Sequence, residues 1–187
     1  MEDIFYKALE WTLHRQDMFV VETTKIGIVK NALSYMTNIQ AKAQFTEAVV
    51  KGLGGNFQLP LRLEFATLVF NLANERAADP RNLLNNYYDE KSQNWMAYVQ
   101  EAKSEVKIDE LKNPESPPIV QTINVQRDIG MIKPWLDSGD SFILVGPEGC
   151  GKNLIIRNLI RQMKSTQLAI IHCNAQTSAF HVIQKLN

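Results

Sequence analysis

The sequence predicts an α/β fold in which a helical domain precedes the first, incomplete part of a parallel-sheet domain. Three observations support this prediction. Residues 1–112 carry apolar positions at helical spacing, residues 113–118 contain three prolines, and residues 119–187 alternate between strand and helix patterns. Because proline cannot continue a helix, we expect residues 113–118 to be a linker between two domains.

Four apolar stripes in the first domain predict four helices. Apolar residues that recur every three or four positions share one helix face, and burial of that face is the usual cause of the pattern. Gly52, Gly54 and Gly55 follow the third stripe, as residues that end helices commonly do. Residues 87–98 contain aromatic pairs without a period, so no element is predicted there. The stripes are Ile4, Ala8, Trp11 and Leu13; Ile28, Leu33 and Met36; Phe45, Val49 and Val50; and Leu61, Phe65, Leu68, Val69 and Leu72.

The second domain is predicted as extended segments that alternate with helices. Ile119 and Val120 form a short extended candidate after the prolines. The apolar run 141–145 is bounded by glycines and has the pattern of a buried strand. The order strand, helix, strand, helix predicts a parallel sheet. The predicted helices are 125–136, with Pro134 near its end, 151–163 and 177–186, and the predicted strands are 141–145 and 168–172.

One segment matches the phosphate-binding pattern G-x-x-x-x-G-K at every fixed position, with a predicted strand before it and a predicted helix after it. Glycines let the backbone curl so that its N–H groups face phosphate oxygens. The following helix directs its free N–H groups and its positive dipole end at the same oxygens, and the lysine adds a positive charge. A solvated glycine-rich turn would leave this spacing unexplained. We therefore predict a P-loop for ATP or ADP, formed by Gly146, Pro147, Glu148, Gly149, Cys150, Gly151, Lys152 and Asn153.

Two departures from the usual P-loop ATPase pattern argue against hydrolysis. The position of the Ser or Thr that binds Mg²⁺ is occupied by Asn153, whose amide oxygen has a different reach, and we assign the Mg²⁺ contact to this residue. No apolar strand that ends in Asp or Glu follows Lys152, although such a residue holds Mg²⁺ and orients water in P-loop ATPases. We therefore predict nucleotide binding and no catalytic residue, since residues 153–187 do not complete a five-stranded core.

The composition argues against several other classes of function. Twenty basic and twenty acidic residues balance, so no general affinity for nucleic acid or anionic membrane is expected. No apolar run reaches the ~18 residues that cross a bilayer. The acidic N-terminus lacks the basic segment of a secretory signal. Cys150 and Cys173 form no disulfide framework and favour a reducing compartment, and His172 beside Cys173 supplies too few ligands for zinc.

The sequence resembles dynein heavy chains, and among them the cytoplasmic dynein of intraflagellar transport. The P-loop alone is generic to AAA+ proteins, whereas the His-Cys-Asn-Ala-Gln-Thr stretch and the glycine-rich segment before Arg62 are more specific. The resemblance covers about residues 20–187. Residues 142–152, 165–167, 172–177 and 184–186 are similar to the third AAA+ module, 119–122 and 133–136 to its lead-in, and 52–56 and 62–65 to the lid of the second module.

This resemblance implies that residues 1–112 are a helical AAA+ lid region and that residues 119–187 are the N-terminal part of a P-loop AAA+ module. Dynein heavy chains carry six such modules, walk on microtubules and move cargo along cilia. The implied ligands are ATP or ADP with Mg²⁺, held at Gly146–Asn153 with Ile119 and Val120 near the adenine. The implied partners are the rest of the ring and the dynein intermediate and light chains, with microtubules reached only through other parts of the heavy chain. The implied location is the cytoplasm, the cytoskeleton and the cilium.

Three alternatives to an active motor fragment are considered. The first is a regulatory module that binds nucleotide without hydrolysing it, and Asn153 favours this alternative. The resemblance implies that the third module of the family binds nucleotide and regulates the main ATPase site in the first module. The second is a free-standing P-loop kinase, which would need a complete core after Lys152. The third is a purely helical interaction protein, which leaves Gly146–Lys152 unexplained.

Overall fold

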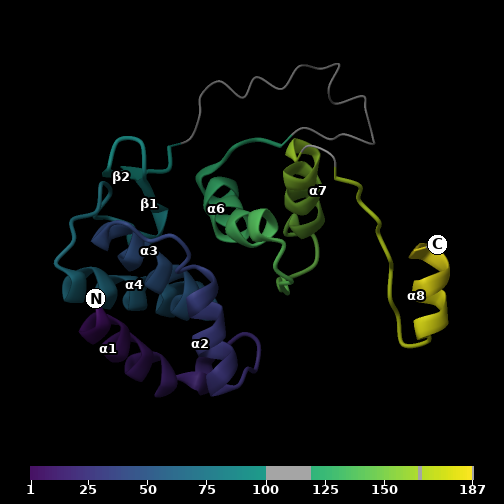
Figure 1. Ribbon diagram of the computed structural model, residues 1–187, viewed down its shortest axis with the longest axis horizontal. Helices are drawn as coiled ribbons and strands as arrows, with labels where there is room; N and C mark the ends of the chain where they lie inside the picture. The colour runs from purple at the N-terminus through teal and green to yellow at the C-terminus, as the bar shows by residue number, and fades with distance from the viewer. Residues whose placement is uncertain (100–118, 164–165, 187) are drawn as a thin grey trace.

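The computed structural model of the chain describes residues 1–99, 119–163 and 166–186. The predicted linker, residues 113–118, lies outside the described residues, as does the predicted domain boundary at residue 112. In the described part of the first half, four α-helices match the four apolar stripes (Figure 1). They are α1 (Glu2–Leu13), α2 (Lys25–Ser34), α3 (Lys42–Gly54) and α4 (Leu59–Ala73), with short 3₁₀ helices η1 (Gln16–Met18) and η2 (Leu83–Asn85).

The core of the first half surrounds α3, which contacts α1, α2 and α4. Val49 of α3 and Val69 of α4 are fully buried. The contact between α3 and α2 is close because Gly52 has no side chain: a Cβ atom there would lie 2.6 Å from the Cα atom of Ala32. The sequence assigned Gly52 only to the end of a helix, and the structure adds this packing role.

A β-hairpin that the sequence did not predict follows the helices. Strand β1 (Asn86–Asp89) pairs antiparallel with β2 (Asn94–Ala97). The hairpin is attached to the helices through Trp95, whose ring lies 4.8 Å from that of Phe70 on α4. The indole N–H of Trp95 also donates to a Glu75 carboxylate oxygen at 3.0 Å.

Three helices of the second half confirm the predicted ones: α6 (Ile123–Ser138), α7 (Lys152–Gln162) and α8 (Ala179–Leu186). Helix α6 contains Pro134, which has no N–H for the helical hydrogen bond to the carbonyl of Gly130. The Lys51 ammonium group donates to this Gly130 oxygen at 2.9 Å instead. The proline is tolerated because a side chain of the first half supplies the missing donor.

The predicted parallel sheet is wrong for the described residues. Residues 141–145 and 168–172 pair with no strand there, and β1 with β2 is the one sheet in the part of the chain that the structure describes. A buried strand needs hydrogen-bonding neighbours on both edges and cover on both faces. Residues 141–145 have cover on one side only: Phe142 and Leu144 pack against helices, whereas Ile143 is 83% exposed.

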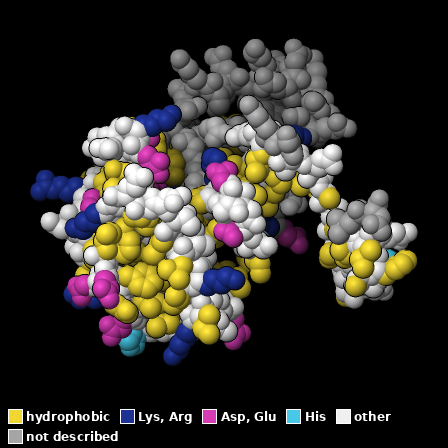
Figure 2. Space-filling model, in the orientation of Figure 1, with side chains coloured by type: hydrophobic (Ala, Val, Ile, Leu, Met, Phe, Trp, Pro, Cys, Tyr) yellow, Lys and Arg dark blue, Asp and Glu magenta, His cyan; other side chains and the backbone are white. Residues whose placement is uncertain are grey.

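Helix α6 joins the two halves. It packs against η2 of the first half and against α7 of the second half. In addition, the Tyr35 hydroxyl donates a hydrogen bond of 2.8 Å to the Met131 carbonyl oxygen on α6. Helix α8 lies apart from the rest in Figure 1, and Figure 2 shows apolar side chains on its surface, where Phe180 and Ile183 are exposed. Within the described residues, no helix is both long enough and apolar enough to span a bilayer.

Candidate functional site

The predicted P-loop runs from residue 146 into the first turn of α7. Gly149 and Gly151 adopt left-handed backbone angles, with φ of 73° and 90°. These conformations are costly for residues with a Cβ atom, so the two glycines are required by the path of the loop. A Cβ atom at either position would meet nothing within 4 Å, so backbone conformation and not crowding favours glycine there.

The N-terminus of α7 carries backbone N–H groups that have no acceptor within the helix. Gly151 is the N-cap residue, and no side chain caps the helix. The first helical hydrogen bond runs from Ile155 N–H to the Gly151 carbonyl at 3.0 Å, so the N–H groups of the preceding residues have no helical acceptor. Such donors, together with the positive end of the helix dipole, favour an anion.

Lys152 adds a full positive charge to these donors. Its ammonium group donates to the carbonyl oxygens of Gly146 at 2.7 Å and Pro147 at 2.6 Å, and it lies 3.5 Å from the sulfur of Cys150. In the described part of the chain, no carboxylate forms an ion pair with Lys152. Its charge is therefore available to an anion, and the loop suits a group with several oxygens, such as a nucleotide diphosphate or triphosphate.

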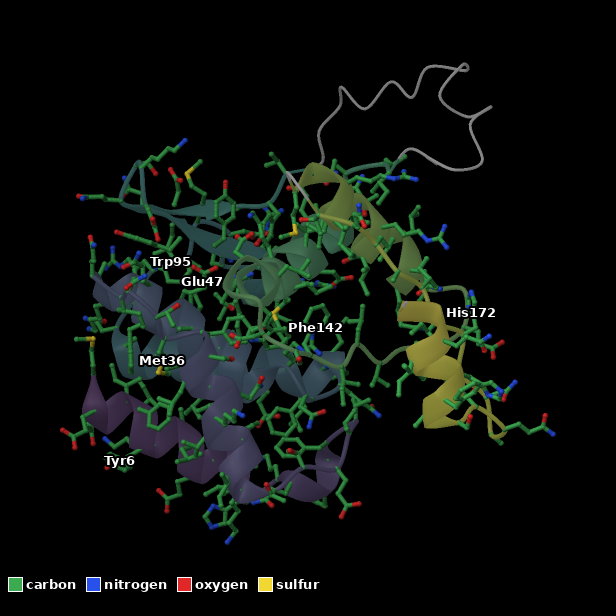
Figure 3. The ribbon with its side chains drawn as sticks, turned by 45° about the vertical axis from the view of Figure 1, so that its right-hand side comes forward. Tyr6, Met36, Glu47, Trp95, Phe142 and His172 are labelled. Atoms are coloured by element: carbon green, nitrogen blue, oxygen red, sulfur yellow. The ribbon has the colours of Figure 1, made fainter. Side chains whose placement is uncertain are left out.

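Apolar contacts fix the segment that leads into the loop. Phe142 and Leu144 pack against a buried cluster formed by Ile132 of α6 with Ile155 and Leu159 of α7. The ring of Phe142 also stacks on that of Trp135, with centroids 5.6 Å apart and an angle of 24° between the planes. Figure 3 shows Phe142 near the middle of the molecule and His172 far from it, beside α8.

Three other residues of the predicted nucleotide site have exposed side chains. Pro147, Glu148 and Asn153 are exposed, and Asn153 lies in the first turn of α7. Among the described residues, no three His, Cys, Asp or Glu side chains gather into a metal site.

Ile119 and Val120, expected near an adenine, precede α6 in an irregular segment. In the described part of the chain, no hydrogen bond and no apolar cluster joins either of them to the P-loop. The sequence instead missed the contact between Trp135 and Phe142, for which the only signal was the aromatic character of the two residues.

A second polar region, formed by Arg62 of α4 with Arg127 and Asp128 of α6, lies between these two helices. Arg62 and Arg127 line a cavity of about 30 Å³ beside it. Burial lowers the pKa of Arg62, and the charge of Arg127 lowers it further. Burial raises the pKa of Asp128, although both arginines oppose this shift. The cavity has room for a water molecule or two but not for a nucleotide, since ligand pockets usually measure about 300–1,000 Å³. This region is therefore a contact between the halves and not a second nucleotide site.

Comparisons with known proteins point to one family. The family model described as "Cytoplasmic dynein 2 heavy chain 1, AAA+ ATPase domain" matches residues 1–73, and "P-loop containing dynein motor region" matches residues 106–187. The cytoplasmic dynein 2 heavy chain 1 of Tripneustes gratilla is 43% identical over 188 residues, which is 100% of this chain. Those of Mus musculus and Homo sapiens are 41% and 40% identical over 187 residues, which is 99% of this chain. The chain spans 4% of the length of each of these relatives.

Proposed function

Because this chain is homologous over its whole length to part of the cytoplasmic dynein 2 heavy chains, we propose that it contributes to the AAA+ ring of such a motor. Residues 1–112 form the helical lid of the second module, residues 113–118 the linker, and residues 119–187 the first part of the third module. The contacts of α6 with the first half support this arrangement, since they join the proposed lid to the proposed module.

The proposed activity of this part of the ring is binding of ATP or ADP by Gly146–Asn153. One observation carries the proposal: Lys152 stands at the N-terminus of α7, which no side chain caps. Its ammonium group contacts loop carbonyl oxygens and, among the residues that the structure describes, no carboxylate. The backbone N–H groups of the loop and of the first helical turn would hold the phosphates, and Lys152 would neutralise them.

The site is proposed to regulate the motor without hydrolysing nucleotide. Mg²⁺ would supply charge neutralisation at the outer phosphates, with the Asn153 amide oxygen as its ligand from this chain. The described residues gather no acidic cluster that could hold the ion more firmly. We therefore expect no ATP turnover above background. Phosphate release that depends on this protein and disappears with Lys152→Ala would contradict this expectation.

Thermal unfolding with and without ADP tests the binding proposal. A ligand at a hundredfold excess over its Kd stabilises the folded state by about 2.7 kcal/mol, which corresponds to a rise of roughly 5–11 °C in Tm for a domain of this size. Lys152→Ala should abolish most of the rise. Lys133→Ala is the matched control, because Lys133 is an exposed lysine on α6 that pairs with Asp137. If folded protein, verified by circular dichroism, shows no shift, the chain alone does not bind ADP.

The metal preference of the site has its own test. Asn153→Thr restores the hydroxyl that Mg²⁺ usually binds, so Mg²⁺ should strengthen ADP binding more in this variant than in the wild type. Asn158→Thr, a matched substitution further along α7, should leave the effect of Mg²⁺ unchanged. An equal response of both variants to Mg²⁺ would argue against a metal contact at position 153.

The role of the whole protein is a proposal drawn from the family. We propose that it acts in microtubule-based intraflagellar transport, in the cytoplasm and cilium, together with dynein intermediate and light chains. Immunolocalisation along cilia and co-precipitation with a dynein intermediate chain are the expected results. Exclusion of the protein from cilia would contradict this role.

A further inference from the structure

We propose that Trp135 is a positioning residue for the P-loop: it connects the segment that enters the loop to α2 of the first half. The inference rests on the proposed nucleotide site and names a residue outside the loop that controls its affinity. Trp135 lies on α6, 11 positions before Gly146, and it makes contacts in both directions.

On the side of the first half, two neighbouring residues at the end of α2 hold the indole. Its N–H group donates to the hydroxyl of Ser34 at 2.8 Å, and its ring lies 4.8 Å from that of Tyr35. The Ser34 hydroxyl in turn donates to the carbonyl of Asn31 at 2.7 Å. The Tyr35 hydroxyl donates to α6 itself, at the carbonyl of Met131. These interactions fix the position and the orientation of Trp135.

On the side of the loop, Trp135 supports Phe142 through the stacked contact at 5.6 Å. Phe142 stands four positions before Gly146 and belongs to the cluster that includes Ile155 and Leu159 of α7. In the part of the chain that the structure describes, no strand pairs with residues 141–145. The position of residues 141–145, which lead into the P-loop, therefore depends largely on the contacts of Phe142 and Leu144.

Ordering of a mobile loop on binding costs conformational entropy, which opposes binding. If the segment before the P-loop is already fixed in the free protein, less entropy is lost when nucleotide binds. Loss of the Trp135 contacts should therefore weaken ADP binding. Trp135→Phe loses the hydrogen bond to Ser34 and keeps a ring, so its Kd for ADP should rise about two- to tenfold. Trp135→Leu also loses both ring contacts, and its Kd should rise about ten- to a hundredfold.

The control is Trp95→Phe. Trp95 also donates its indole N–H to a side chain and also contacts a phenylalanine ring, at 4.8 Å and a tilt of 45°, but its partners, Glu75 and Phe70, belong to the first half. This variant should bind ADP as the wild type does. Ser34→Ala, which removes the acceptor of the Trp135 bond, should resemble Trp135→Phe, and the double variant should be no weaker than either single one, since both changes break the same bond. The proposal would be overturned if the effects of Ser34→Ala and Trp135→Phe on the Kd for ADP added in the double variant. It would also be overturned if Trp135→Leu bound ADP as tightly as the wild type.

A second measurement needs no nucleotide. The thiol of Cys150 is exposed and lies beside Lys152 within the loop, so its rate of reaction with a thiol reagent reports loop conformation. In a Cys173→Ser background, Trp135→Leu should change this rate, and Trp95→Phe should not. If wild-type protein binds no ADP, the proposal that this chain alone binds nucleotide fails, and the thiol rate decides the role of Trp135. An unchanged rate in Trp135→Leu then refutes that role. If Trp135→Leu does not fold by circular dichroism, Trp135→Phe carries both measurements.

Discussion

Substitution of Gly52 by Ala tests the close packing of α2 on α3. An added Cβ atom would lie 2.6 Å from the Cα atom and 3.2 Å from the carbonyl oxygen of Ala32. Both are backbone atoms, so no side-chain rotation can relieve the contact. The two helices must move apart, and the hydrogen bond of 2.6 Å from the Asn31 amide to the Gly52 carbonyl would lengthen with them.

The expected cost combines three contributions. Overpacking in a core costs typically about 1–3 kcal/mol, and the weakened hydrogen bond costs roughly 1 kcal/mol more. The better helix propensity of alanine returns roughly 1 kcal/mol. The free energy of unfolding should therefore fall by about 2 kcal/mol, and Tm by roughly 4–8 °C.

Urea denaturation monitored by circular dichroism measures this loss, with Gly27→Ala as the matched control. A Cβ atom at Gly27 would lie 2.6 Å from the hydroxyl oxygen of Thr23, which is the end of a side chain that can rotate. Gly27→Ala should therefore be neutral or stabilising, by up to about 1 kcal/mol. If Gly52→Ala is as stable as Gly27→Ala, the proposed steric role of Gly52 is wrong.

Three further predictions concern Tyr35, Thr24 and Gly139. Burial raises the pKa of Tyr35 above its ordinary value of 10.0, so the folded state keeps the proton that the unfolded state releases as the pH rises above 10, and stability should fall there. Tyr35→Phe should remove up to about 1.4 kcal/mol per pH unit of that fall, measured by urea denaturation between pH 9 and 11. The Thr24 hydroxyl caps α2 by accepting from Gly27 N–H at 3.1 Å, so Thr24→Ala should cost about 1 kcal/mol in the free energy of unfolding, whereas Thr24→Ser should cost little. Gly139 ends α6 at φ of 74°, so Gly139→Ala should lower Tm, by an amount equivalent to roughly 1 kcal/mol, and an unchanged Tm would show that this strain is absent.

Helices α1 to α4 were predictable because each buries apolar residues, and a buried face leaves a period in the sequence. The P-loop was predictable for a different reason: its glycines and lysine are required by the path of the backbone and by the charge of phosphate. The structure adds that Gly149 and Gly151 are the two with left-handed angles. Pro134, which the sequence placed near the end of the predicted helix 125–136, is accommodated inside α6, where the Lys51 ammonium group donates to the carbonyl oxygen that the proline leaves without a helical donor.

The hairpin was missed because its turn lacks the usual glycine signal. Residues 90–93 contain no glycine or asparagine, and Gln93 adopts the left-handed angle with φ of 54°. The strands at 141–145 and 168–172 were predicted from composition, but a strand exists only where another strand pairs with it, and no local pattern reports that partner. The link from α2 through Trp135 to Phe142 joins positions about a hundred residues apart in the chain, and local sequence periods carry no information on such contacts.

The exposed side of residues 141–145 has a consequence for handling the protein in solution. Ile143 and Val145 are 83% and 52% exposed, and the backbone beside them has no ladder partner among the described residues. A short apolar stretch of this kind can pair with its own copy on another molecule and start a cross-β aggregate. Asp140 precedes the stretch and Pro147 follows it, and charge and proline at these places hinder such stacking. Replacement of Asp140 by a neutral residue should therefore lower the concentration at which the protein stays dispersed.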